Sequence, residues 1–306
     1  MNLLLYILNV AAARTESALG KHSGQHGGSV NSFNLAKTLA AAVLSAIISL
    51  ALGFSFNLDV LLLAVLYGSA LALSMHAGVK ALSLGNMAIV SMLASFSLII
   101  PCIFGLVFLE ERLSPPGIAG IALLCLALLL LGIGRGGGGR LSGICWLYSI
   151  LTLIGNGISS VIQKLQQTRY PGEYRIEFML ISGTFAFLIF LVLSSITKPR
   201  SKVKLKLDPT AKLSEGNGNA DKTGASTFVM FPFTLGGLAG ICNCIANYSI
   251  LFLASSENAS VMFPIISAGN TIGAWLVSRL VFKEKLTAVQ LISVTLGALS
   301  VILLKI

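Results

Sequence analysis

Long apolar runs follow one another along almost the whole chain, separated by Gly, Pro and clusters of charge. A helix needs about 20 residues to cross a hydrocarbon core, and most of these runs are that long. Reading their limits predicts ten helices at 3–22, 32–53, 60–83, 86–109, 114–133, 142–165, 175–197, 228–254, 257–282 and 286–305. The expected fold class is therefore all-α integral membrane, with about ten transmembrane helices.

The composition supports a membrane rather than an aqueous environment. Of the 306 residues, 55% are hydrophobic and 10% are charged, whereas soluble domains carry roughly 25% charged residues. The net charge of +10 would suit a nucleic-acid binder. However, Lys and Arg lie mostly between the apolar runs or at their ends, as in cytoplasmic loops. We therefore expect membrane lipids as neighbours and no nucleic acid as a partner.

The sequence shows no pattern typical of an enzyme or of a cofactor site. The five cysteines lie in apolar segments, with no His or further Cys at metal-ligand spacing. No P-loop is present, so ATP hydrolysis by that route is not expected. We predict no catalytic residue, no metal and no cofactor.

Two polar interruptions divide the chain. The Gly-rich segment 135–141 separates the helices five and five, and residues 198–227 have the composition of a solvated loop. The basic part of that loop would also suit anionic lipid headgroups. The expected domains are a first five-helix unit at 1–134 and a second at 142–306.

The two units resemble each other at corresponding places. Val107–Ser114 reads VFLEERLS and Val281–Thr287 reads VFKEKLT, so that Glu111 corresponds to Glu284 when one inserted residue is allowed. An odd number of helices per unit places the two copies in opposite orientations, a plan that recurs in secondary transporters. Chance similarity between apolar helices is the alternative for the helix bodies.

With these junctions, the chain resembles the drug/metabolite transporter (DMT) superfamily, and within it the EamA-like ten-helix transporters. The most specific part is Phe282–Thr287, followed by Gln290 and Gly297, with Pro264 upstream. The resemblance implies two inverted repeats around a central cavity. It also implies a gradient-driven secondary transporter or exchanger of a small metabolite or drug-like solute, multi-pass in the bacterial inner or plasma membrane.

The first predicted helix carries two ionisable residues, Arg14 and Glu16, about 200° apart around its axis. Asn9, Ala13, Glu16 and Gly20 share one face, which we expect to line a cavity. A partly buried carboxylate can exchange a proton near neutral pH, so Glu16 is the first candidate for substrate binding or for a coupling proton. The small multidrug resistance branch of the superfamily also has a first-helix glutamate. A structural ion pair with another helix is the alternative.

Arg14 would either contact an anionic group in the cavity or extend toward the headgroups. The remaining candidates are uncharged or weakly basic side chains inside the third, sixth, eighth and ninth predicted helices: His76, Asn156, Ser160, Asn243, Asn247 and Asn270. Packing or a helix-to-helix hydrogen bond is the alternative for each of them, and for His76, Asn243, Asn247 and Asn270 taken singly it is slightly favoured. Taken as a set they favour a polar path through the bundle.

Other charged and kinking residues are expected to be structural. We predict that Glu111 and Glu284 cap helices or pair with Arg112 and Lys285, that Lys164 extends to the membrane surface, and that Pro264 kinks or breaks its helix.

Orientation and function class stay open at this stage. Lys and Arg are most numerous on the side that holds residues 198–227, which places both termini outside; the family has them in the cytoplasm. Nine spans would also satisfy the charges if the first segment did not cross. A non-transporting membrane scaffold or sensor and a membrane-embedded lipid-modifying enzyme are the alternatives to a transporter.

Overall fold

The computed structural model describes residues 2–25, 29–84, 94, 96–112, 114–133, 143–196, 221–280 and 288–305. These residues form ten α-helices and one 3-10 helix, and no strand occurs among them. The elements are α1 (Asn2–Gln25), α2 (Val30–Leu52), α3 (Leu58–Leu84), η1 (Phe96–Leu98), α5 (Ile99–Phe108), α6 (Pro115–Ile133), α7 (Gly143–Arg169), α8 (Arg175–Ile196), α9 (Asp221–Ala254), α10 (Ala259–Leu280) and α11 (Ala288–Lys305).

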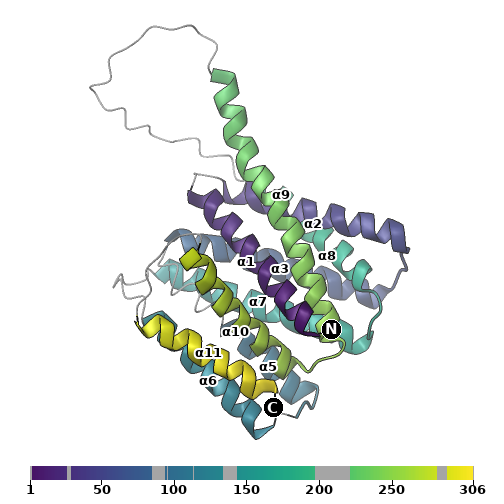
Figure 1. The fold of residues 1–306 in the computed structure, drawn as a ribbon. Helices are drawn as coiled ribbons and strands as arrows, with labels where there is room; N and C mark the ends of the chain where they lie inside the picture. The colour runs from purple at the N-terminus through teal and green to yellow at the C-terminus, as the bar shows by residue number, and fades with distance from the viewer. Residues whose placement is uncertain are drawn as a thin grey trace, which may run out of the picture.

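Each helix expected from the apolar runs has a counterpart in the structure. The run 86–109 is described only from Phe96 onward, as η1 and α5. The linker 135–141, the junction at 281–287 with Glu284, and loop residues 198–220 lie outside the described residues. The expected loop 198–227 is wrong at its end, because residues 221–227 belong to α9. Residues 221–227 are polar because the start of α9 extends beyond the other helices (Figure 1). Their composition indicates contact with solvent, and it does not indicate a loop.

Five helices in the described part of the chain are long and apolar enough to cross a membrane. They are Val30–Leu52, Leu58–Gly78, Gly143–Arg169, Arg175–Ile196 and Phe233–Ala254. Helix α1 is not one of the five, and it carries both Arg14 and Glu16. Large apolar side chains such as Leu50 and Leu62 are exposed on the outer faces. An all-helical fold with these properties fits a membrane-embedded protein.

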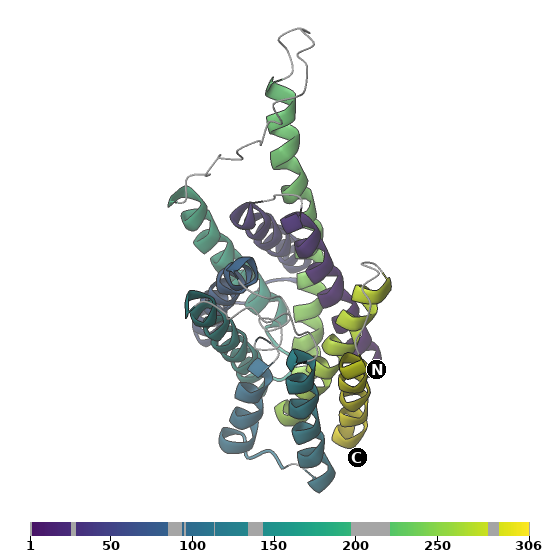
Figure 2. The ribbon, with the colours of Figure 1, turned by 90° about the vertical axis from the view of Figure 1, so that its left-hand side faces the viewer.

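The helices pack side by side in one bundle, as Figures 1 and 2 show. Helix α9 contacts both α1 and α2, α3 contacts α7 and α8, and α6 lies beside α11 at one edge. Both ends of the described chain lie at the same end of the bundle, opposite the projecting start of α9.

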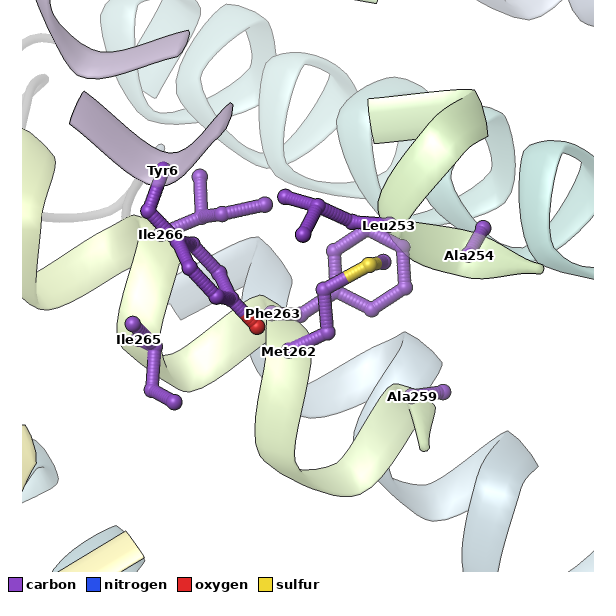
Figure 3. Packing of buried hydrophobic residues seen from close by; sticks show 8 residues of the cluster. All are labelled: Tyr6, Leu253, Ala254, Ala259, Met262, Phe263, Ile265 and Ile266. Carbon is purple, nitrogen blue, oxygen red and sulfur yellow. The ribbon is translucent and has the colours of Figure 1, made fainter. Parts of the chain in front are cut away.

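Apolar packing joins α1, α9 and α10 near the end of the bundle that holds the termini. Tyr6 of α1 lies over Phe263 and Ile266 of α10, and Leu253 of α9 completes the contact (Figure 3). Each of these side chains is at most 7% exposed. This cluster fixes the position of α1 against the two later helices.

Two glycines bring α9 very close to α2. A Cβ atom at Gly236 would lie 2.6 Å from the carbonyl oxygen of Phe33, and one at Gly240 would collide with the carbonyl oxygen of Lys37. Small residues four apart allow membrane helices to approach at backbone distance. The approach places the Lys37 side chain beside α9.

Helix α10 continues through Pro264 without interruption, so a break is excluded and the kink stays a prediction. Pro264 lies in the second turn, where its missing N–H removes the bond to the carbonyl of Ser260 and leaves the helix beyond it intact. The start of this helix is instead held by a carboxylate from elsewhere in the chain, described below.

Candidate functional site

A buried ion pair lies between α1 and α2. The Nζ atom of Lys37 donates to Oε1 of Glu16, and Nδ2 of Asn243 on α9 donates to Oε2 of the same carboxylate at 3.0 Å. The side chains of Lys37 and Glu16 are 7% and 20% exposed. Glu16 is therefore held by two side chains from two other helices, and the ion pair with another helix that was anticipated is present.

The hydrogen bonds continue from Asn243 into the middle of the bundle. Nδ2 of Asn247 donates to the side-chain oxygen of Asn243 at 3.1 Å, and Oδ1 of Asn247 accepts from the Tyr67 hydroxyl at 2.7 Å. Nε2 of Gln163 on α7 lies 3.1 Å from both Oδ1 of Asn247 and the Tyr67 oxygen. Tyr67 and Gln163 are 1% and 2% exposed.

These six side chains form one connected set, which we call the central network: Glu16, Lys37, Tyr67, Gln163, Asn243 and Asn247. Apart from the Asn243–Asn247 step within α9, its links join side chains on different helices. The network thus connects α1, α2, α3, α7 and α9. A movement of one of these helices relative to the others therefore changes hydrogen bonds of the network. A chain of hydrogen bonds that contains one carboxylate and one ammonium can bind a polar solute or carry a proton.

The two other candidates on α1 face different neighbours. Nδ2 of Asn9 donates to the backbone oxygen of Ala246 on α9 at 2.8 Å, and the residue is 1% exposed. Arg14 lies against α10, where a Cβ at Gly273 would come within 2.8 Å of its Cγ. Glu16 turns instead toward α2 and α9, so the expected divergence of Arg14 and Glu16 is confirmed.

The candidates on α3 and α7 make a separate contact. The Ser74 hydroxyl donates to Oδ1 of Asn156, and a Cβ at Gly155 would come within 2.9 Å of Ser74, so the two helices meet closely here. The Ser160 hydroxyl donates to the backbone oxygen of Asn156 at 2.9 Å, within its own helix. This pattern is typical of helix packing.

His76 and Asn270 stand apart from the other candidates. Nδ1 of His76 and Oδ1 of Asn270 are buried, and neither has a hydrogen-bond partner among the described residues. Within those residues, no hydrogen bond or ion pair links either side chain to the central network. The structure thus brings together three sequence candidates, Glu16, Asn243 and Asn247.

The members that were not among the sequence candidates are Lys37, Tyr67 and Gln163. Each is a polar side chain within a long apolar run, and Lys37 is a charge that a membrane helix buries only at a cost. That cost was the available signal for Lys37. For Tyr67 and Gln163, the positions of α3 and α7 relative to α9 decide the contact, and spacing along one helix does not contain that information.

A second buried ion pair, which we call the Glu111–Lys164 clamp, lies between helix ends. The Glu111 carboxylate accepts the backbone N–H groups of Ala259 and Ser260 at 2.8 and 2.9 Å, and the Ser260 hydroxyl at 2.8 Å. It therefore caps the start of α10, because the first N–H groups of a helix have no partner within it. Its oxygen lies 3.7 Å from Nζ of Lys164.

Lys164 completes the clamp on the side of α9. Its Nζ donates to the backbone oxygens of Ala254 at 3.1 Å and Glu257 at 2.5 Å, at the carbonyl end of that helix. The expected extension of Lys164 to the membrane surface is wrong. Helix α7 continues beyond Lys164 to Arg169, and the Lys164 ammonium is bound inside the protein. The capping role expected for Glu111 is confirmed, while its partner is Lys164 rather than Arg112.

A cavity of about 490 Å³ lies elsewhere, between the end of α2, the start of α8 and the end of α9. Its walls are mainly apolar and include Leu52 and Phe252. Its charged groups are already bound, since Glu177 accepts from the N–H and hydroxyl of Ser55, and Arg175 donates to Gln167 and covers the Phe252 ring at 4.1 Å. None of the sequence candidates lines it, so we place the site at the central network.

No group of three or more His, Cys, Asp or Glu side chains suited to a metal ion occurs within the described residues.

Comparison with known proteins gives the fold and nothing more. No protein-family model matches the sequence, and no curated protein is similar to it. The solved structures that are similar to this chain include a crystal structure that matches at a TM-score of 0.65 and 15% sequence identity, over 99% of this chain and 98% of the other. At that identity the likeness shows a shared arrangement of helices along the whole chain.

Proposed function

We propose that this protein is a secondary active transporter or exchanger that moves a small solute across a membrane, with the central network as its substrate or coupling site. The observation that supports the proposal is the Glu16–Lys37 pair, which lies between helices and connects through Asn243 to side chains from both halves of the chain. A coupling proton and a small-molecule substrate are the ligands we assign to it.

Packing alone gives little reason for these charges to be there. Replacing a buried ion pair by apolar residues is often neutral or stabilising, so stability does not require the pair. Ionisable residues within membrane segments usually face a wet path and mark ion or substrate routes. Glu16 is also the more exposed partner, at 20% of its side chain, and so is the group that solvent or substrate can reach.

The arrangement of the helices supports ten spans built as two inverted five-helix repeats, 1–134 and 142–306, including α1 as a span. If α1, α2, α3, α5 and α6 correspond to α7, α8, α9, α10 and α11, then the contacts occur in matching pairs. The α1–α9 contact matches α7–α3, α2–α9 matches α8–α3, and α1–α10 matches α7–α5. A two-fold relation between the halves gives this pattern, and secondary transporters use it.

The family proposal follows from the same features. An EamA-like member of the drug/metabolite transporter superfamily would lie in the bacterial inner or plasma membrane as a multi-pass protein. In such a bundle, protonation of Glu16 removes the charge that holds Lys37 and weakens the bond from Asn243. The part of α1 around Glu16 is then held less tightly to α2 and α9, which couples a proton or solute to the movement of the halves.

Reconstitution of the full chain in proteoliposomes tests the proposal. We expect uptake or efflux of at least one compound from a panel of labelled metabolites, driven by an imposed pH or solute gradient. Glu16→Gln should lower the gradient-driven rate at least tenfold, while Glu173→Gln, at an exposed position between α7 and α8, should leave it unchanged. Absence of movement for every compound, or equal rates in wild type and Glu16→Gln, would refute the proposal.

A further inference from the structure

The charges inside α1 and α2 do not balance. Arg14, Glu16 and Lys37 lie well inside the two helices, and Glu16 is already bound to Lys37 and Asn243. Arg14 has no ion pair with any carboxylate among the described residues. Among the described residues, one positive charge is therefore left without a carboxylate bound to it.

The position of Arg14 argues against contact with lipid headgroups. It is the thirteenth residue of α1, about 18 Å along a helix of 24 residues, given a rise of about 1.5 Å per residue. Its stem packs on Gly273 of α10, a residue that is itself buried. A stem held at mid-helix is too far from both ends of α1 to reach headgroups there, as snorkelling requires.

The Arg14 guanidinium also has unused hydrogen-bonding capacity. Its Nε atom is buried and has no hydrogen-bond partner among the described residues. Guanidinium is planar, always charged, and matches the two oxygens of a carboxylate or phosphate group. A buried, unpartnered donor with this geometry indicates a ligand with an oxyanion.

We propose that the transported solute is a small organic anion, a carboxylate or a phosphate monoester, and that Arg14 binds its oxyanion between α1 and α10. The proposal rests on the proposed function, whose site it extends. The anion supplies the missing counter-charge, and the adjacent Glu16–Lys37 pair stays neutral overall. Binding and release of the anion thus change the net charge inside the bundle. Through this change a solute can shift the equilibrium between two arrangements of the helices.

Binding to matched probe pairs tests the assignment. The purified full chain, in nanodiscs of phosphatidylcholine alone, is titrated with lactate and lactamide, succinate and succinamide, and glycerol 3-phosphate and glycerol, with thermal unfolding as the readout. We expect at least one anion to raise the unfolding temperature and its neutral partner not to. The bilayer carries no net charge, so anionic lipid cannot supply the effect.

Variants connect the effect to Arg14. Arg14→Gln should weaken apparent anion affinity at least tenfold, and Arg14→Lys should retain part of it, since a charge-assisted hydrogen bond is lost in the first and kept in the second. Gly273→Ala, which crowds the Arg14 stem without removing its charge, should also weaken binding. Arg169→Gln removes an exposed positive charge at the end of α7 and should change nothing.

The outcomes separate this inference from the proposed function. Anion binding that depends on Arg14, without transport in proteoliposomes, would keep the anion site and refute the transporter. Transport of neutral compounds alone, with full activity in Arg14→Gln, would keep the transporter and overturn the anion site. Failure of every anion to bind, or equal affinity in wild type and Arg14→Gln, would also overturn it.

Discussion

The described residues contain two glutamate–lysine pairs that are buried or partly buried, and the two pairs are held in different ways. In the Glu111–Lys164 clamp, both charges are bound by backbone groups: the carboxylate accepts two N–H groups at the start of α10, and the ammonium donates to two carbonyl oxygens near the end of α9. In the central network, Glu16 is held by the side chains of Lys37 and Asn243.

This difference separates a fixed site from one that can change partners. Backbone groups at helix ends cannot turn away from their ligands unless the helices themselves move. Side chains can change rotamer, and Glu16 is 20% exposed whereas Glu111 is 7% exposed. We infer that the clamp holds α9, α10 and the α5–α6 connection together, and that the central network is the part that responds to solute or protons.

The largest effect is expected at the clamp. Glu111→Gln removes the charge opposite Lys164 and weakens the cap of α10, and breaking a buried ion pair by changing one partner costs about 3–5 kcal/mol. We expect a large loss of folded protein and a lower unfolding temperature in detergent. Glu110→Gln changes the neighbouring exposed residue in the same way and should leave stability unchanged.

A double variant separates the loss of the ion pair from the cost of an unpaired ammonium. Adding Lys164→Met to Glu111→Gln removes the unpaired ammonium and should recover part of the lost stability. If Glu111→Gln is as stable as Glu110→Gln, the clamp is not a fixed structural site and the contrast with the central network disappears.

The close approach of α9 to α2 is expected to matter next most. Gly240→Val places a branched side chain against the Lys37 carbonyl oxygen, and overpacking of this kind costs about 1–3 kcal/mol. It should also move Lys37 away from Glu16 and reduce gradient-driven transport. Gly237→Val is the matched control, because a Cβ at Gly237 meets no atom within 4 Å.

Thermal unfolding and proteoliposome flux measure the two effects separately. Equal loss of both quantities in Gly240→Val and Gly237→Val would show that the approach of the helices does not position the pair.

The apolar runs were sufficient to place the helices, because length and hydrophobicity along one segment determine whether it can be a membrane helix. The prediction was wrong at residues 221–227, where polar composition was interpreted as a loop, and at Lys164, which was expected at a helix end. For the site, Glu16, Asn243 and Asn247 were recognised as polar residues in apolar surroundings. Their connection was not, because it depends on contacts between helices far apart in the sequence.

The smallest effect is expected where the network is least charged. Tyr67→Phe removes one hydroxyl, which donates to Asn247 at 2.7 Å and lies 3.1 Å from Nε2 of Gln163. A buried hydrogen bond contributes about 1 kcal/mol net, so the unfolding temperature should fall only slightly. If the network couples its helices, however, the variant should change the dependence of transport on pH more than it changes stability. Ser182→Ala on α8 is the comparison. It loses a buried hydroxyl whose one hydrogen bond within the described part of the chain goes to the backbone oxygen of Met179 in the same helix. Identical effects of the two variants on stability and flux would mean that Tyr67 contributes packing alone and that the central network reaches Gln163 through Asn247 without it.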